Sequence, residues 1–128
     1  FLVFLGIKIY TKFPDEEKSN WKLYQYYCKF SFDGHIIDKY IDNKDHNFKK
    51  VIISGINGNK TLRLDFEKPE LFFYLQKGDS VVKTKNSLDI KLKRSGFDTI
   101  IRLRFQYLIK PMSPDWHCGY EWPPMPEE

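Results

Sequence analysis

The sequence predicts an all-β domain with one or two short helices. Apolar and polar residues alternate with a period of two over residues 88–93 and 99–107, as in strands that bury one face. Aromatic residues make up 17% of the chain, which favours strands. Turn residues separate five or six short runs, with a short helix expected between the third and the fourth. This order fits a small, partly open antiparallel barrel of the OB or SH3-like kind, with a two-layer sandwich as the alternative.

Turn residues set the limits of the predicted strands. Asp33-Gly34 interrupts the first strand, where glycine is typical of a bulge or a bend. Asn57-Gly58 predicts a hairpin, and Ser95-Gly96-Phe97-Asp98 predicts a turn between the last two strands. The predicted strands are residues 30–41, 48–54, 60–66, 81–83, 88–93 and 99–107.

Two helices are expected. A short helix begins at Lys68-Pro69-Glu70 and ends at Gly78, because proline suits the first turn and glycine the end of a helix. A second follows the polar residues 14–20 and turns into strand near Cys28.

The alternation also predicts which side chains point inward. These are Leu62, Leu64 and Phe66 in the third strand, and Ile90, Leu92, Ile101, Leu103 and Phe105 in one core formed by the last two strands.

Composition divides the chain into four segments. Residues 1–13 are the C-terminal part of an expected membrane anchor, and residues 14–29 are a linker with a short helix. Residues 30–110 are the β-barrel domain, and residues 111–128 are a tail rich in proline and aromatic residues.

The apolar start, Phe1–Tyr10, is too short to span a bilayer, which needs about 20 residues. We interpret it as the end of a signal-anchor helix that starts upstream. An ordinary buried strand is the alternative, because Ile7 and Ile9 alternate with polar residues.

The tail carries five of the seven prolines and two of the three tryptophans. Trp116, Tyr120 and Trp122 are candidate partner-docking residues, because aromatic anchors dominate many interfaces. Cys28 and Cys118 are a candidate disulfide if the domain is exported, and two buried free thiols are the alternative.

Catalytic, metal and cofactor sites are not expected. The cysteines and histidines lack the paired spacings of zinc sites, and His117 and Cys118 are adjacent. The loop at residues 42–47 lacks the glycine and final glutamate of a calcium loop. The chain contains no G-x-S-x-G nucleophile motif.

The net charge of +4 is mild, and acidic residues are interleaved with the basic ones. A nucleic-acid binder usually concentrates its positive charge, so we expect no nucleic-acid partner. The residues to test for binding to single strands are Lys91, Lys93, Arg102 and Arg104.

Four stretches lie within residues 30–107: FDGHIIDKYIDNKDHNF, the V-I-I strand that follows it, KGDSVVK, and the R-x-G-x-D-T-I-I run. Together they resemble a family of small, exported or membrane-anchored β-rich proteins of Bacteroidetes. The resemblance implies an N-terminal lipoprotein or membrane-anchor signal, of which residues 1–9 would be the end. It implies no activity, and the proline-rich tail departs from the family's pattern.

These observations favour a non-catalytic accessory or structural subunit of a larger membrane or cell-envelope assembly. It would be anchored on the exported side, in the periplasm or cell envelope, and would dock through its two ends to protein subunits and to membrane lipid. The alternative is a soluble barrel that binds a ligand or peptide, and the third interpretation is single-stranded nucleic-acid binding.

Overall fold

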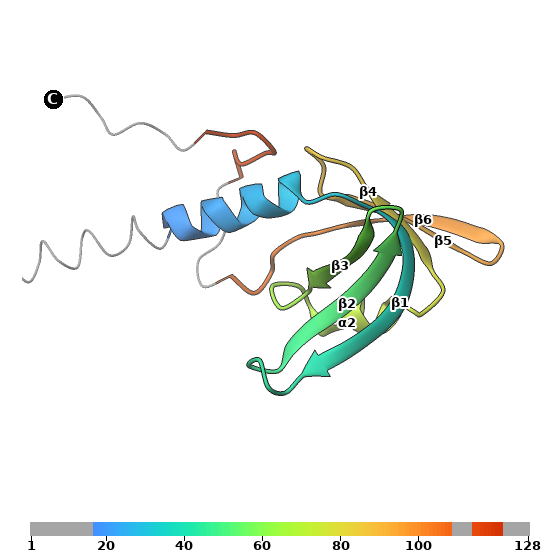
Figure 1. Cartoon of the computed structure of the whole chain (residues 1–128). Coiled ribbons are helices and arrows are strands. Elements are labelled where there is room, and N and C mark those ends of the chain that lie inside the picture. Colours follow the sequence, from blue (N-terminus) through green and yellow to red (C-terminus); the bar gives the residue numbers. More distant parts are fainter. Residues whose placement is uncertain (1–16, 109–113, 122–128) are drawn as a thin grey trace, which may run out of the picture.

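The computed structural model describes residues 17–108 and 114–121. A helix over residues 17–29 stands beside a curved antiparallel sheet, and residues 114–121 run next to this helix (Figure 1). The elements that follow the helix are β1 (Phe32–Asp42), β2 (Phe48–Gly55), β3 (Gly58–Arg63), α2 (Pro69–Tyr74), β4 (Ser80–Lys83), β5 (Asp89–Arg94) and β6 (Phe97–Arg102). The fold is therefore mostly β, with two short helices.

The six strands form one open sheet in the order β3-β2-β1-β4-β5-β6. Strands β1 to β3 form one meander and strands β4 to β6 form another. The pairing of Phe32–His35 with Ser80–Lys83 joins the two meanders, and Ile36 extends this junction through backbone hydrogen bonds with Gly78 and Asp79. At the centre of the sheet, Gly34 faces Gly55 on one side and Val81 on the other.

Gly34 has a steric reason to be glycine. A Cβ at this position would lie 1.9 Å from the carbonyl oxygen of Ser54, far inside van der Waals contact. The prediction of a bulge at Asp33-Gly34 is wrong, because the register shift of β1 lies between Ile36 and Asp38. Glycine here allows the close approach of two strands.

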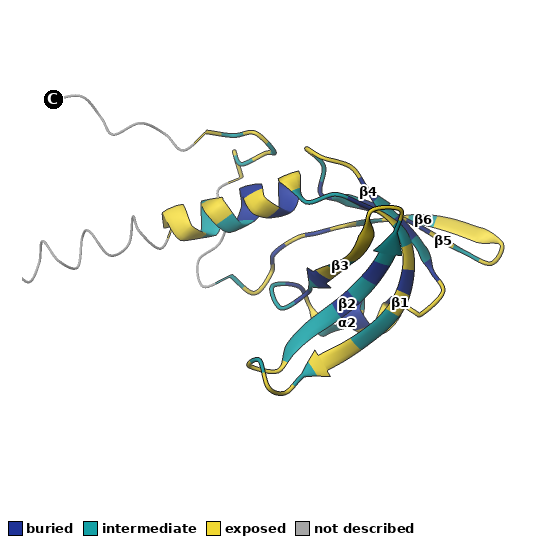
Figure 2. Ribbon diagram, in the orientation of Figure 1, coloured by how far each residue is buried: buried dark blue, intermediate teal, exposed yellow. Residues whose placement is uncertain are grey.

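The core lies between the inner face of the sheet and the N-terminal helix (Figure 2). Ile90, Leu92, Leu103 and Phe105 are buried, and Ile101 packs against the same cluster, which confirms the predicted core of the last strands. From the helix, Tyr24, Tyr27 and Cys28 enter this core.

The helix continues to residue 29, and β1 begins at Phe32. The predictions that strand starts near Cys28 or at Phe30 are therefore wrong. Tyr24, Tyr27 and Cys28 lie three and four residues apart, so helical geometry puts all three on the core face. The sequence around Cys28 fits both a helical and a strand pattern, and packing against the core favours the helix.

The last strand is shorter than predicted: β6 ends at Arg102 instead of Tyr107. The backbone N–H groups of Arg104 and Phe105 donate to the carboxylate of Glu67 instead of to a strand, and Phe105 has φ 52°. The strand β3 likewise ends at Arg63, before the predicted Phe66, which is half-buried.

Two turns also differ from the predictions. Helix α2 ends at Tyr74, and Gly78, with φ 93°, lies in the turn before β4. The β5–β6 turn consists of Ser95 and Gly96 alone, because Arg94 already pairs with Phe97.

Candidate functional site

The tail lies on its own N-terminal helix. Cys28 and Cys118 form a disulfide with a Cα–Cα distance of 5.4 Å, which is consistent with an oxidising, exported compartment. Trp116 packs edge-on against Tyr24, with ring centroids 5.8 Å apart. Trp21 Nε1 donates to the carbonyl oxygen of Tyr120 at 2.7 Å.

Gln25 strengthens this attachment. Its side-chain nitrogen donates to the carbonyl oxygen of His117 at 3.1 Å, and its oxygen accepts from the N–H of Gly119 at 2.9 Å. Of the three predicted docking residues, Trp116 and Tyr120 thus belong to a segment bound within the chain, and Trp122 lies outside the described residues.

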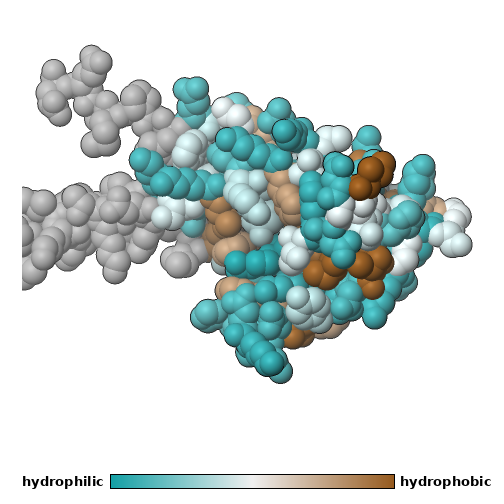
Figure 3. Space-filling view, viewed as in Figure 1, coloured by the Kyte–Doolittle hydropathy of each residue, from teal (hydrophilic) through white to brown (hydrophobic). Residues whose placement is uncertain are grey.

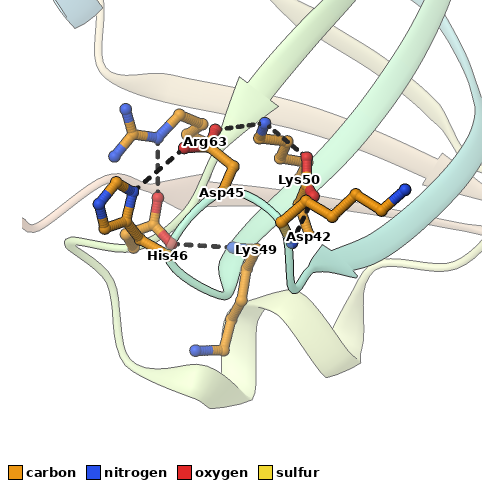
Figure 4. Close-up of polar contacts among 8 residues, drawn as sticks. Asp42, Asp45, His46, Lys49, Lys50 and Arg63 are labelled. Carbon is orange, nitrogen blue, oxygen red and sulfur yellow. Dashed lines mark hydrogen bonds and ion pairs between the residues drawn. The ribbon is translucent and has the colours of Figure 1, made fainter.

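Carboxylates at the end of β1 and in the loop that follows form ion pairs with a lysine of β2. Lys50 Nζ lies 3.0 Å from Asp42 Oδ2 and 2.7 Å from Asp45 Oδ2 (Figure 4). The hydrogen bond from Lys50 lowers the pKa of Asp45, and the same bond raises the pKa of Lys50. Arg63, on β3, pairs with Asp65 at 2.9 Å and stacks on Phe48 at 3.7 Å. This cluster is an ion-pair network that fixes the loop.

The four basic residues singled out for nucleic acids do not form a continuous basic surface. Lys93 and Lys91 face Asp98 and Ile100 across the β5–β6 pair. Arg102 forms an ion pair with Asp89 at 3.3 Å, and Arg104 lies beyond the end of β6. Charges of opposite sign therefore alternate across these two strands.

Two buried ionic groups bind backbone atoms. Lys83 Nζ donates to the carbonyl oxygens of Cys28, Phe30 and Thr84, and burial lowers the pKa of Lys83 to about 8. Burial raises the pKa of Glu67, although two backbone N–H groups partly oppose this shift. Both side chains join segments that no regular pairing connects, so their role is structural.

A third buried group, Asp79, is paired with an arginine. Arg94 Nε and Nη2 donate to the two carboxylate oxygens of Asp79 at 2.9 and 2.7 Å. The hydrogen bond from Arg94 lowers the pKa of Asp79. Arg94 Nη2 also donates to the carbonyl oxygen of Tyr74 at 2.7 Å, which ties the end of α2 to β5.

Aromatic side chains are exposed around this buried pair. The aromatic strip consists of Phe73, Tyr74 and Phe97, which are 63%, 40% and 44% exposed. The Arg94 guanidinium lies 4.8 Å from the ring centroid of Tyr74 and 5.9 Å from that of Phe97. Lys39 Nζ, from β1, lies 5.8 Å from the ring centroid of Phe73 and bonds to the carbonyl oxygen of Phe72.

Exposed apolar residues also interrupt the hydrophilic surface over β1 and β2, as Figure 3 shows for one face of the molecule. The exposed apolar residues of β1 include Ile37 and Ile41, each 47% exposed. The aromatic strip differs in that the Arg94 guanidinium, which Asp79 holds, lies beside its rings. The strip is therefore the candidate site for a protein partner.

A hollow of about 380 Å³ lies at the other end of β4. Its apolar wall includes Phe32, Ile53 and Val82, and Lys60 and Lys85 line it with Lys83. Lys60 Nζ donates to the carbonyl oxygen of Ser31 at 2.5 Å.

Among residues 17–108 and 114–121, no helix is long and apolar enough to cross a membrane. The same residues contain no group of three His, Cys, Asp or Glu side chains that could hold a metal ion. No known protein family, curated protein or solved structure matches the chain. The family resemblance within residues 30–107 stays a prediction.

Proposed function

We propose that this domain is a non-catalytic accessory module that binds a protein subunit of a cell-envelope assembly through the aromatic strip. The observation that supports it is that Phe73, Tyr74 and Phe97 are exposed beside the Asp79–Arg94 ion pair. Large aromatic side chains that stay exposed on a rigid surface are typical of protein interfaces. The Asp79–Arg94 pair holds the strip in place, so little ordering is required when a partner binds.

The proposed docking surface differs from the one that the sequence suggested. Trp116 and Tyr120 lie in a segment that the helix and the disulfide already hold, so the aromatic strip replaces the tail as the docking surface. The N-terminal membrane anchor, residues 1–13, stays part of the proposal and lies outside the described residues. The exported location is supported by the Cys28–Cys118 disulfide.

The test is site-specific photocrosslinking in the native cells. A photoreactive amino acid at Phe73 should give a discrete crosslink to an envelope protein. The matched control is Tyr107, which is also an exposed aromatic residue (56% exposed) but bonds through its N–H to Phe66, outside the strip. A crosslink at Phe73 and none at Tyr107 supports the proposal. The same products at both positions, or none at Phe73, would overturn it.

A second function, binding of a small anionic amphiphile, is favoured by the hollow near Lys83. Lysines on its rim and an apolar wall match a ligand that has a carboxylate and a short alkyl chain. Octanoate is a suitable calorimetric probe, and Lys85→Glu should weaken its binding about tenfold. If octanoate at about 1 mM gives no binding heat, this second function is wrong.

We further propose that the sheet is a partly open barrel of the OB-like kind. Three features support it: β1 pairs with both β2 and β4, α2 lies between β3 and β4, and Tyr107 N–H donates to the carbonyl oxygen of Phe66 across the open side. Measured protection of the Tyr107 amide from hydrogen exchange would support this closure, and fast exchange would contradict it.

A further inference from the structure

Strand β6 (Phe97–Arg102) is an edge of the sheet, and the β5–β6 hairpin projects from the body of the domain (Figure 1). An edge strand presents unpaired backbone N–H and C=O groups that another strand can pair with. Which groups these are follows from the phase of the hydrogen bonds between β5 and β6.

The phase is set by two observations. The two-residue turn makes Arg94 and Phe97 the first hydrogen-bonded pair of the hairpin. At the other end, Leu103 N–H donates to the carbonyl oxygen of Leu88, in the same alternation. The odd-numbered residues of β6 therefore bond to β5. The backbone groups of Asp98, Ile100 and Arg102 point to the free edge.

The other edge strand, β3, is partly covered. The carbonyl oxygen of Arg63 accepts a hydrogen bond from Tyr27 of the N-terminal helix at 3.1 Å. Beyond the end of β6, Glu67 occupies the N–H of Arg104. On this side of the sheet, the stretch of free edge therefore ends with β6 itself.

We propose that two copies of this chain associate through their β6 strands, which pair antiparallel about a two-fold axis at Ile100. In this register Asp98 lies opposite the partner's Arg102, and Ile100 lies opposite the partner's Ile100. These are the residues whose backbone groups point outward, so each opposite pair exchanges two hydrogen bonds. The two sheets become one twelve-stranded sheet.

Charge complementarity supports this partner and this register. Within the chain, Asp98 already faces Lys93, and Arg102 already pairs with Asp89. Across the two copies, the row becomes Lys93, Asp98, the partner's Arg102 and the partner's Asp89, and the sign of the charge alternates at every step. Cross-strand pairs of opposite charge stabilise a sheet, whereas like charges destabilise it.

The exposure of Ile100 fits the same arrangement. Its side chain is 63% exposed at the centre of the edge, and in the dimer it packs against its own copy. A register shifted by two residues in one direction would place Asp98 opposite the partner's Ile100 and leave both ionic pairs unmade. A shift in the other direction would place Asp98 opposite the partner's Arg104, which lies beyond β6 and whose N–H bonds to Glu67. The sequence of β6 thus specifies a single register.

The inference does not rest on the proposed function. Phe73 and Tyr74 lie on α2, and the backbone groups of Phe97, which is the strip residue in β6, bond to Arg94 of β5 and do not point to the free edge. The primary measurement is sedimentation of the full chain against concentration. The wild-type protein should reach twice its mass of 15.4 kDa. Asp98→Lys and Arg102→Glu should each weaken the dimer at least tenfold, because each places two like-charged pairs across the axis.

Mixing the two charge-reversed variants is the decisive experiment. In the mixed dimer, Lys at 98 of one copy faces Glu at 102 of the other, and the native Arg102 and Asp98 face each other as well. The mixture should therefore recover dimers that neither variant forms alone. Failure of the mixture to recover dimers would overturn the proposal, as would a wild-type protein that stays monomeric up to about 1 mM.

A backbone variant gives an independent check. Ile100→Pro removes an N–H that points to the free edge and breaks no bond to β5. It should therefore give a monomer with the circular dichroism spectrum of the wild type. A folded Ile100→Pro protein that still dimerises would overturn the proposal. If this variant does not fold, the charge-reversed mixture still decides.

Discussion

Breaking the Cys28–Cys118 disulfide should both lower the stability of the domain and release its tail. The bond closes a chain separation of 90 residues. For a loop of this length, the chain-entropy relation gives a loss of about 4.6 kcal/mol at 25 °C when the bond is removed. This figure is the expected upper limit, because the folded state also gains freedom if the tail leaves the helix.

The contacts of the tail indicate that it does leave. Trp21, Tyr24 and Gln25 make four hydrogen bonds to residues 116–120. At about 1 kcal/mol each, with about 2 kcal/mol for burial of Trp116, they contribute about 6 kcal/mol. Ordering residues 114–121 costs about 1–2 kcal/mol per residue, which is larger in total. The disulfide is therefore required to hold the tail on the helix.

The assay combines denaturant unfolding with hydrogen exchange, with and without reductant. Reduction should lower the free energy of unfolding by up to about 4.6 kcal/mol and abolish protection of the Gly119 amide, which bonds to Gln25. A Cys28→Ala/Cys118→Ala variant is the control, because reductant should not affect it. Protection of Gly119 that survives reduction would refute the reasoning.

Three further predictions concern buried positions. Gly34→Ala should lower the free energy of unfolding by about 3 kcal/mol or more, because its Cβ would meet the Ser54 oxygen at 1.9 Å. Gly55→Ala should cost less, because its nearest atom is 2.7 Å away; equal denaturant midpoints would contradict the register. The hydrogen bond from Arg94 lowers the pKa of Asp79 in the folded protein. The contribution of Asp79 to the free energy of unfolding is therefore present above pH 3.8 and is lost as the pH falls through the folded pKa. When the free energy of unfolding is measured as the pH is lowered, Asp79→Asn should not show this loss. A variant whose acid profile matches the wild type would contradict the assignment to Asp79. The pKa of Lys83 falls from 10.5 to about 8 on folding, so stability should rise between these pH values. Lys83→Met should remove that rise, and a variant that keeps it would show that another group is responsible.

The strands were predictable because alternation is a local signal. Leu88–Lys93 alternates strictly, and the structure places β5 over Asp89–Arg94, within a residue of the prediction. The hairpin predicted at Asn57-Gly58 was found for a similar reason, since its turn chemistry lies in adjacent residues. The turn itself is one residue earlier, at Ile56 and Asn57, because Gly58 already pairs with Gly55.

The end of β6 was not predictable from the same signal. The alternation continues to Tyr107, but Glu67, far away in the sequence, takes the backbone N–H groups of Arg104 and Phe105. A buried carboxylate that replaces a strand cannot be recognised from residues 99–107 alone. Local pattern and tertiary hydrogen bonding conflict at this point, and the hydrogen bonds decide the structure.

The aromatic strip was missed for a different reason. Phe73 and Tyr74 fit the apolar side of a short helix, so the sequence gives no sign that they are exposed. The base of the strip, Asp79 and Arg94, lies on two separate segments whose proximity depends on the β4–β5 pairing. Conversely, Trp116 looked like a docking residue because its intrachain partner, Tyr24, is distant in the sequence.

The narrow junction between the two meanders has a consequence for how the domain opens. Each meander is built from neighbouring strands and has its own local hydrogen bonds, whereas the strand pairing between them is confined to the first residues of β1 and to β4. Cooperative unfolding units often coincide with such supersecondary motifs. Rare fluctuations should therefore separate the two halves along this junction first, and both halves should keep their hairpins while apart. The Glu67 carboxylate, which accepts from the N–H groups of Arg104 and Phe105, would then still link the chain after β3 to the chain after β6.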